Sequence, residues 1–339
     1  MRSSFGLIPG VLAVAILLAA IPAYATFPGT NGRIAFLQDG NIFTMNSDGS
    51  DVHQLTSFTG DTSASWQNWS PDGKQLVFVE FPPPDFNGQI WLMNADGSNQ
   101  HLVLSDSGFD LESPAFSPDG TSIAFTRCQL FVDDLFCGLR RVQTDGTGVV
   151  ELTPLTVGVT DFEPAYSPDG SSLAFDSFGR GGILGAVYVS NADGSNIQLL
   201  TPPEFGGKNA DWSPDGTMVS FSTHCCNSLN DEIWSIAHGF GLFPVTKTSN
   251  LQDIHPSWSP QADAIAFARF GPDFGDSAIY ILNLDGSGRL QKIHALPDTP
   301  QPVKRGLSAQ SRIGASAQRI RPLPTESGGN LPRWGAASN

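Results

Sequence analysis

Three aspartates at matching points of the chain could together hold a cation: Asp110, Asp161 and Asp253. Each stands three or four residues before a proline, at the start of a segment that we expect to form an innermost strand beside a central channel. A ring of carboxylates at the channel mouth would suit Ca²⁺, which takes oxygen ligands. The alternative is that the carboxylates only cap backbone N–H groups of loops.

The four cysteines offer two further kinds of chemistry. Cys128 and Cys137 flank the segment QLFVDDLF, and in an oxidising compartment we expect them to form a disulfide that staples a local hairpin. Cys225 and Cys226 are adjacent, so they would either form a strained vicinal disulfide or stay reduced. His224 precedes this pair, but adjacent residues cannot easily share a tetrahedral zinc, and no metal is assigned to them.

A repeated turn sets the positions of all these residues. Ser-Pro-Asp-Gly occurs four times and a decayed copy, Ser-Pro-Gln-Ala, follows; the copies begin at Ser70, Ser117, Ser167, Ser213 and Ser259. They are spaced by 46 to 50 residues. A second turn of the Asp-Gly-Ser type keeps the same phase, first as SDGS at 47–50 and then as ADGS at 95–98. Self-similarity at a fixed period indicates a repeat architecture.

Each period has the pattern of four strands. An aromatic residue ends the first strand directly before Ser-Pro, and a run that alternates apolar and polar residues follows the turn, as in TSIAFTRC. A third strand, as in EIWSIA, leads through a turn to the fourth. Four antiparallel strands in each period predict an all-β fold, a six-bladed β-propeller of four-stranded blades over residues 26–296.

The first repeat lacks its first strand. FPGTNGRIAF at 27–36 matches only the turn and the second strand of the other repeats. We expect residues Leu331–Trp334 to close the ring, because GNLPRWG shares its Pro-x-Trp with DIHPSWS. The rest of the basic segment 297–339 has a composition typical of poor order. The alternative is a wholly disordered tail, with closure by residues near 301–306.

The first 25 residues are typical of a signal peptide. Arg2 precedes the apolar run GVLAVAILLAAI, and AYA at 23–25 fits a cleavage site. The run is shorter than the roughly 20 residues that a membrane span needs. We therefore expect export to the periplasm or the cell exterior, with no membrane span after cleavage. The net charge of −15 argues against a nucleic-acid partner, because phosphate contacts need a basic surface.

Two of the repeated segments, WSPDGKQLVFVE and IWLMNADGSNQHLVL, resemble the PD40 repeat, the WD40-like repeat of TolB propellers. The likeness extends over roughly residues 27–295. TolB carries an α/β domain before its propeller, for which this sequence leaves no room, so the resemblance implies only the binding of other proteins by the propeller. Prolyl oligopeptidase-like enzymes carry similar propellers beside a hydrolase domain, but the sequence has no Gly-x-Ser-x-Gly elbow.

These patterns predict a binding or scaffold protein whose variable loops and channel mouth hold a protein or a cell-envelope ligand. The loops after the second and fourth strands differ in length and carry aromatic residues, namely Phe81, Phe86, Phe131, Phe136, Phe178 and Phe274. The alternative for these rings is that they only pack the loops against the fold. Function on scaffolded folds usually lies in such loops. The alternative is a propeller enzyme, a polysaccharide lyase or hydrolase with a metal-assisted site in the central pocket. No catalytic residue is assigned.

Overall fold

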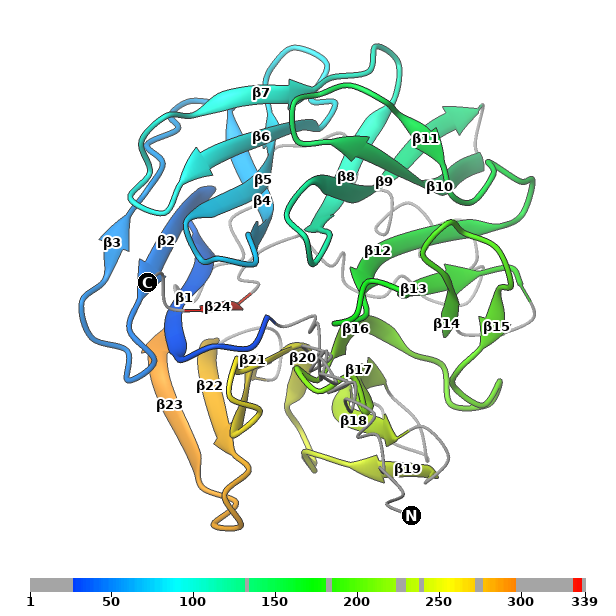
Figure 1. The fold of residues 1–339 in the computed structure, drawn as a ribbon. Helices are drawn as coiled ribbons and strands as arrows, with labels where there is room; N and C mark the ends of the chain where they lie inside the picture. Colours follow the sequence, from blue (N-terminus) through cyan, green and yellow to red (C-terminus); the bar gives the residue numbers. More distant parts are fainter. Residues whose placement is uncertain are drawn as a thin grey trace, which may run out of the picture.

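The computed structural model describes residues 27–131, 134–180, 185–223, 230–237, 241–271, 277–296 and 332–336. Every element in these ranges is a β-strand, and Figure 1 shows the strands arranged as sheets around a central axis. This confirms the predicted β-propeller class. The described residues include no helix that is long and apolar enough to cross a membrane.

Four sheets are separate and have four strands each. Unit 1 contains β24 (Arg333–Ala336), β1 (Asn31–Gln38), β2 (Asn41–Met45) and β3 (His53–Gln54). Unit 2 contains β4 (Ser63–Trp69), β5 (Gln75–Phe81), β6 (Gln89–Asn94) and β7 (His101–Leu104). Unit 5 contains β16 (Lys208–Trp212), β17 (Met218–Thr223), β18 (Glu232–Ala237) and β19 (Gly241–Pro244). Unit 6 contains β20 (Gln252–Trp258), β21 (Ala264–Phe270), β22 (Ala278–Asn283) and β23 (Leu290–Ala295).

The remaining strands form one eight-stranded sheet. Unit 3 contains β8 (Asp110–Phe116), β9 (Ser122–Phe131), β10 (Asp134–Gln143) and β11 (Val150–Glu151). Unit 4 contains β12 (Thr160–Tyr166), β13 (Ser172–Phe178), β14 (Ala186–Asn191) and β15 (Gln198–Leu199).

A single parallel pairing, between Cys137 of β10 and Thr160 of β12, joins units 3 and 4. The described residues therefore form six four-stranded units, as predicted for the blades, but units 3 and 4 share one sheet and only four units are separate sheets. The physical reason is the length of the β9–β10 hairpin. Both of its strands have ten residues, which is longer than any other strand in the described chain, and so β10 extends far enough to pair with its neighbour.

The repeated turn is held by the residues that define it. Ser70 Oγ donates to Asp72 Oδ1 at 2.8 Å and accepts the N–H of Gln75 at 2.9 Å. Gly73 supplies the left-handed conformation, with φ of 66°, that closes the turn. Equivalent side-chain contacts recur at Ser117, Ser167 and Ser213. The same short sequence therefore folds into the same hairpin start in each of these units.

The core lies between neighbouring units. One cluster joins Ile34 and Phe36 of β1 to Ala266 and Ile279 of unit 6, and further clusters join successive units in the same way. Each second strand contributes one fully buried phenylalanine at the same repeat position: Phe36, Phe78, Phe125, Phe175, Phe221 and Phe267. Because a unit buries its faces only against its neighbours, the ring must close to complete the core.

The C-terminal strand β24 closes the ring beside β1, with which it pairs antiparallel. The expected closing segment was 331–334; the strand begins at Arg333, and Leu331 lies outside the described residues. Trp69 Nε1 donates to the carbonyl oxygen of Arg333 at 3.3 Å, and the N–H of Trp334 donates to Ser257 Oγ at 3.2 Å. The closing strand is thus anchored to units 2 and 6. The segments predicted as signal peptide, 1–25, and as poorly ordered tail, 297–328, also lie outside the described residues.

Candidate functional site

The innermost strands of units 2 to 6 share a bulge in mid-strand. At the bulge the register against the second strand shifts, and one residue takes a left-handed conformation with φ between 48° and 56°: Trp66, Ser113, Glu163, Asn209 and His255. Each of these residues stands four positions before the serine of the Ser-Pro turn. Bulges and non-glycine residues with positive φ cost energy and are concentrated at functional sites.

In units 4 to 6 the bulge binds the preceding unit through a polar side chain. The N–H of Glu163 donates to Thr126 Oγ1 at 3.1 Å, and the N–H of Asn209 donates to Asp176 Oδ2 at 2.6 Å. The N–H of His255 donates to Ser222 Oγ at 3.1 Å. The acceptors occupy one repeat position in the second strand, where other units carry Leu37, Val79 and Ala268. This position is therefore polar in units 3 to 5 and apolar in units 1, 2 and 6.

Four of these side chains, Glu163, Asp176, Asn209 and His255, are named here the polar hub residues. Asn209 connects two carboxyl groups, since its backbone N–H binds Asp176 and its Nδ2 donates to Glu163 Oε2 at 2.7 Å. Within the described residues, three buried atoms of this group have no hydrogen-bond partner: Asp176 Oδ1, Asn209 Oδ1 and His255 Nδ1. Such atoms are costly unless a proton, a water molecule or a ligand satisfies them.

The environment of the polar hub shifts the pKa values of two members in the direction that removes charge. Burial, with the neighbouring charge of Glu163, raises the pKa of Asp176 well above its usual value. Burial, with the positive charges of Arg333 and Lys208, lowers the pKa of His255 well below its usual value. The environment thus favours the neutral form of both side chains.

The polar hub residues were not predicted from the sequence, although a signal was present. In three repeats a polar residue directly follows the buried phenylalanine of the second strand, namely Thr126, Asp176 and Ser222. An apolar residue at that position would continue the core, so a polar residue there interrupts the pattern. The partner across the unit boundary, however, is evident only from the folded ring.

The three aspartates predicted to share a cation are held separately. Asp161 is fully buried and accepts two hydrogen bonds from Arg180, at 2.9 and 2.7 Å. Asp253 is bound in the same way by Arg269, at 2.6 and 2.7 Å. Asp110 Oδ1 accepts the N–H of Gly88 at 2.7 Å.

No group of three or more His, Cys, Asp or Glu side chains in the described residues is placed to hold a metal ion. The predicted Ca²⁺ site at Asp110, Asp161 and Asp253 is therefore not formed by these carboxylates. Guanidinium groups pair with Asp161 and Asp253, and Asp110 accepts the N–H of Gly88, which lies before β6 in the neighbouring unit.

The end of the channel where the variable loops lie is named the variable-loop face, and a pocket opens there between units 4 and 5. It is lined by Phe178, Phe205 and Lys208, among others, and measures about 270 Å³ including the solvent at its mouth. Lys208 Nζ lies 3.2 Å from Asp231 Oδ2. The pocket thus combines aromatic rings with a charged pair, which is the composition of many ligand sites.

The loop aromatics differ in their exposure. Phe81 is fully buried against Trp66, so it belongs to the core and not to an exposed surface. Phe178 is half-buried and contacts Phe162 edge-on. Phe86 and Phe136 are also half-buried, whereas Phe274 and the side chain of Phe131 lie outside the described residues.

The cysteines of the β9–β10 hairpin are bonded to each other. Cys128 and Cys137 are direct partners across the two strands, their Sγ atoms are 2.09 Å apart, and both side chains are buried. They pack against Phe162 of the next unit. His224, Cys225 and Cys226 lie outside the described residues.

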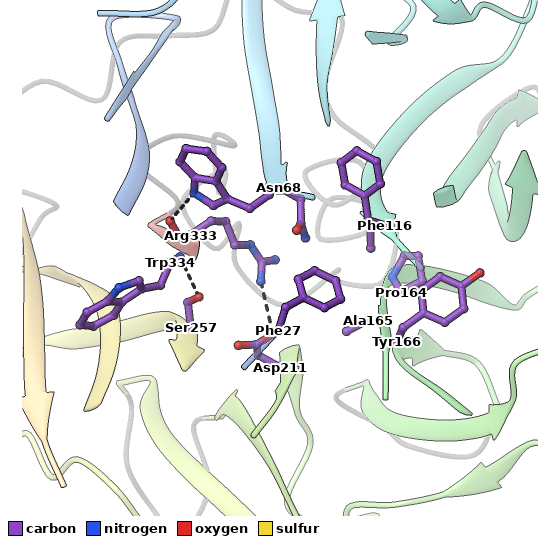
Figure 2. A pocket seen from close by; sticks show the side chains of 12 residues that line it. Phe27, Asn68, Phe116, Pro164, Ala165, Tyr166, Asp211, Ser257, Arg333 and Trp334 are labelled. Atoms are coloured by element: carbon purple, nitrogen blue, oxygen red, sulfur yellow. Dashed lines mark hydrogen bonds and ion pairs between the residues drawn. The ribbon is translucent and has the colours of Figure 1, made fainter. Parts of the chain in front are cut away.

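A second pocket opens at the opposite end of the channel, which is named the Ser-Pro face because the innermost strands end there in the Ser-Pro turns. Figure 2 shows Phe27, Phe116, Tyr166, Asp211 and Arg333 gathered around it. Its volume is about 500 Å³ including open solvent. This pocket combines aromatic rings with polar and charged side chains, whereas the pocket between units 4 and 5 is lined mainly by apolar groups.

The four-stranded antiparallel units arranged around a central axis define the class of this molecule as a β-propeller. The family described as PD40, the TolB beta propeller domain, matches residues 67–294, which is more than half of the chain, and the protein belongs to this family. No curated protein matches the sequence.

Solved structures share the fold. TolB from Acinetobacter baumannii is 19% identical with a TM-score of 0.65, over 90% of this chain and 67% of that one. A putative TolB from Agrobacterium tumefaciens is also 19% identical, with a TM-score of 0.59, over 79% of this chain and 90% of that one. Oligogalacturonate lyase from Vibrio parahaemolyticus is 14% identical with a TM-score of 0.53, over 81% of this chain and 78% of that one. Likeness at these identities extends to the fold alone.

Proposed function

We propose that this protein is an exported TolB-like propeller that binds a protein or a cell-envelope ligand at its variable-loop face. The observation that carries the proposal is the pocket between units 4 and 5, where Phe178 and Phe205 provide an apolar lining beside the Lys208–Asp231 pair. Aromatic side chains and a few placed charges are typical of recognition sites. Membership of the TolB propeller family, in which the propeller is expected to bind proteins, supports the same function.

The ion pairs on this face add to the argument. Arg180, Arg269 and Lys208 each pair with a carboxylate that is almost completely buried, while their own side chains remain 12 to 21% exposed. Each pair is therefore rigid and still presents part of a cation to the solvent. A partner with surface carboxylates would find these groups in fixed positions, at little cost in side-chain entropy.

Photo-crosslinking tests the location of this binding site. The full-length exported protein would carry p-benzoylphenylalanine in place of Phe205, and a matched protein would carry it in place of Leu199, an exposed residue of the outer strand β15. We expect a specific crosslinked species in envelope extract from position 205 only. Equal crosslinking from both positions, or none from position 205, would contradict the assignment.

The enzyme alternative has one supporting observation, the structural likeness to oligogalacturonate lyase, including one structure described as a complex with manganese. The described residues offer no cluster of metal ligands, so any such site would need groups outside them. Incubation with oligogalacturonate and Mn²⁺, followed by absorbance of unsaturated products, distinguishes the two functions. Product formation would favour the lyase, and its absence at high protein concentration would favour the binding protein.

A further inference from the structure

The pocket at the Ser-Pro face contains part of the protein's own N-terminal segment. The ring of Phe27 lies in this pocket between Asp211 and Phe116 (Figure 2). It packs against the apolar cluster that includes Leu111 and Phe116. The aromatic side chain is half-buried there, so the pocket accommodates a ring of this size.

All six units contribute to this pocket. Its lining comes from the innermost strands β4, β8, β12, β16, β20 and β24, through residues such as Asn68, Phe116, Tyr166, Asp211, Ser257 and Trp334. A side chain seated at this point therefore lies where all the units converge. Concave sites of this kind, formed by several elements, are the usual binding sites of small groups on protein folds.

Phe27 can leave the pocket without any loss of sheet structure. Residues 27–30 precede β1, which begins at Asn31, and they are not paired in a strand. The pairing of β1 with β24, which closes the ring, starts only at Asn31. The cost of displacement is limited to the contacts of one half-buried ring and a short segment.

The pocket also contains a partly exposed positive charge, that of Arg333, which forms an ion pair with Asp211. Arg333 Nη1 lies 3.8 Å from Asp211 Oδ1, which is too far for a hydrogen bond. Asp211 uses its other oxygen to accept the N–H of Trp258 at 2.9 Å. The Arg333 side chain is 20% exposed. A carboxylate entering beside the aromatic ring would therefore meet a guanidinium group that can bind it with two hydrogen bonds.

We propose that this pocket is a peptide-binding site for an aromatic residue next to an acidic residue, and that Phe27 occupies it until such a partner segment displaces it. The chain's own ring demonstrates the fit of the apolar part, and Arg333 provides the counter-charge for the acidic part. The site lies at the opposite end of the channel from the pocket between units 4 and 5. It is thus independent of the function proposed above.

Peptide binding to full-length variants tests this proposal. The probe is a fluorescein-labelled octapeptide, Gly-Ser-Gly-Phe-Glu-Gly-Ser-Gly, followed by fluorescence anisotropy. Phe27→Ala empties the pocket, and we expect it to bind the probe roughly tenfold more tightly than the unchanged protein, because no ring must be displaced. Peptides with Ala-Glu or Phe-Gln at the centre should bind more weakly to the same variant.

Two further variants separate this mechanism from a general effect on the surface. Adding Arg333→Gln to Phe27→Ala should reduce the affinity for the Phe-Glu peptide to that for the Phe-Gln peptide. Phe243→Ala, which removes a 39% exposed ring from the outer strand β19, should leave the affinity unchanged.

Phe27→Leu, which keeps an apolar side chain, gives an intermediate affinity and serves if the alanine variant does not fold. The proposal is overturned if the unchanged protein and the folded Phe27 variants bind the Phe-Glu peptide equally, or if none of them binds it. It is also overturned if the Ala-Glu peptide binds the variants as tightly as the Phe-Glu peptide.

Discussion

For Asp176→Asn we predict a pH-dependent gain in stability. The unfolding free energy of the variant minus that of the unchanged protein should increase as the pH rises. Asp176 is almost completely buried between units 4 and 5, with Glu163 and Lys208 as its charged neighbours. Burial and the charge of Glu163 raise its pKa well above the usual value. Between the pKa of the unfolded chain, about 3.9, and the raised pKa of the folded state, the folded protein holds a proton that the unfolded chain has lost.

The sign of the effect follows from this proton. Stability falls as the pH rises wherever the folded state binds more protons than the unfolded state, and the slope for one proton is about 1.4 kcal/mol per pH unit. The unchanged protein therefore loses stability through this window, up to the folded pKa of Asp176. Asp176→Asn removes the titration and with it the slope, while the amide oxygen can still accept the N–H of Asn209.

Urea denaturation at intervals from about pH 4, near the unfolded pKa, to about pH 8 measures the effect as the difference in unfolding free energy between the two proteins. Asp169→Asn is the matched control in an exposed repeat turn. Burial there would raise the pKa of Asp169, but hydrogen bonds from Ser167 and Ser171 lower it overall. Its contribution is lost only as the pH falls below about 4, so its difference should be flat. A flat difference for Asp176→Asn as well would refute the reasoning.

Further substitutions test the ion pairs, the closure, the disulfide and export. Arg180→Gln leaves the buried carboxylate of Asp161 without its partner and should lower the unfolding free energy by about 3 kcal/mol, measured in urea; no loss would show that the carboxylate is already compensated. Trp334→Ala should cost about 3 kcal/mol and lower the Tm if β24 closes the ring, whereas an unchanged Tm would contradict closure. Cys128→Ser should destabilise the protein by about 2 kcal/mol, because the bond closes a short loop, and a reducing agent should then have no further effect. Exported protein should begin at Thr26 by N-terminal sequencing, and a start at Met1 would contradict cleavage.

The local structure of this protein could be predicted because short repeated segments of the sequence determine it. Ser70, Asp72 and Gly73 interact only with residues of their own turn, so the sequence pattern and the hairpin correspond directly. The same holds for the pairing of Cys128 with Cys137, which are neighbours across one hairpin. The antiparallel four-stranded unit and the propeller class follow from the period of such turns.

The side-chain contacts at the two ends of the channel could not be predicted in the same way. Asp161 and Asp253 were expected to share a cation, but Arg180 and Arg269 bind them, and nothing in the repeat pattern identifies those partners. Phe27 was regarded as part of a turn, whereas the fold places it in the axial pocket. Such contacts depend on side-chain geometry between separate segments.

The sequence by itself determined the hairpins and the number of repeats, because those features depend on residues within one period. Only the tertiary structure decided which side chains meet at the hub. Asn209 touches Asp176 and Glu163, residues 33 and 46 positions away, only when units 4 and 5 lie side by side. The ring, which β24 closes beside β1, brings such residues together. The pattern within one period does not indicate which partner each buried polar atom has across a unit boundary.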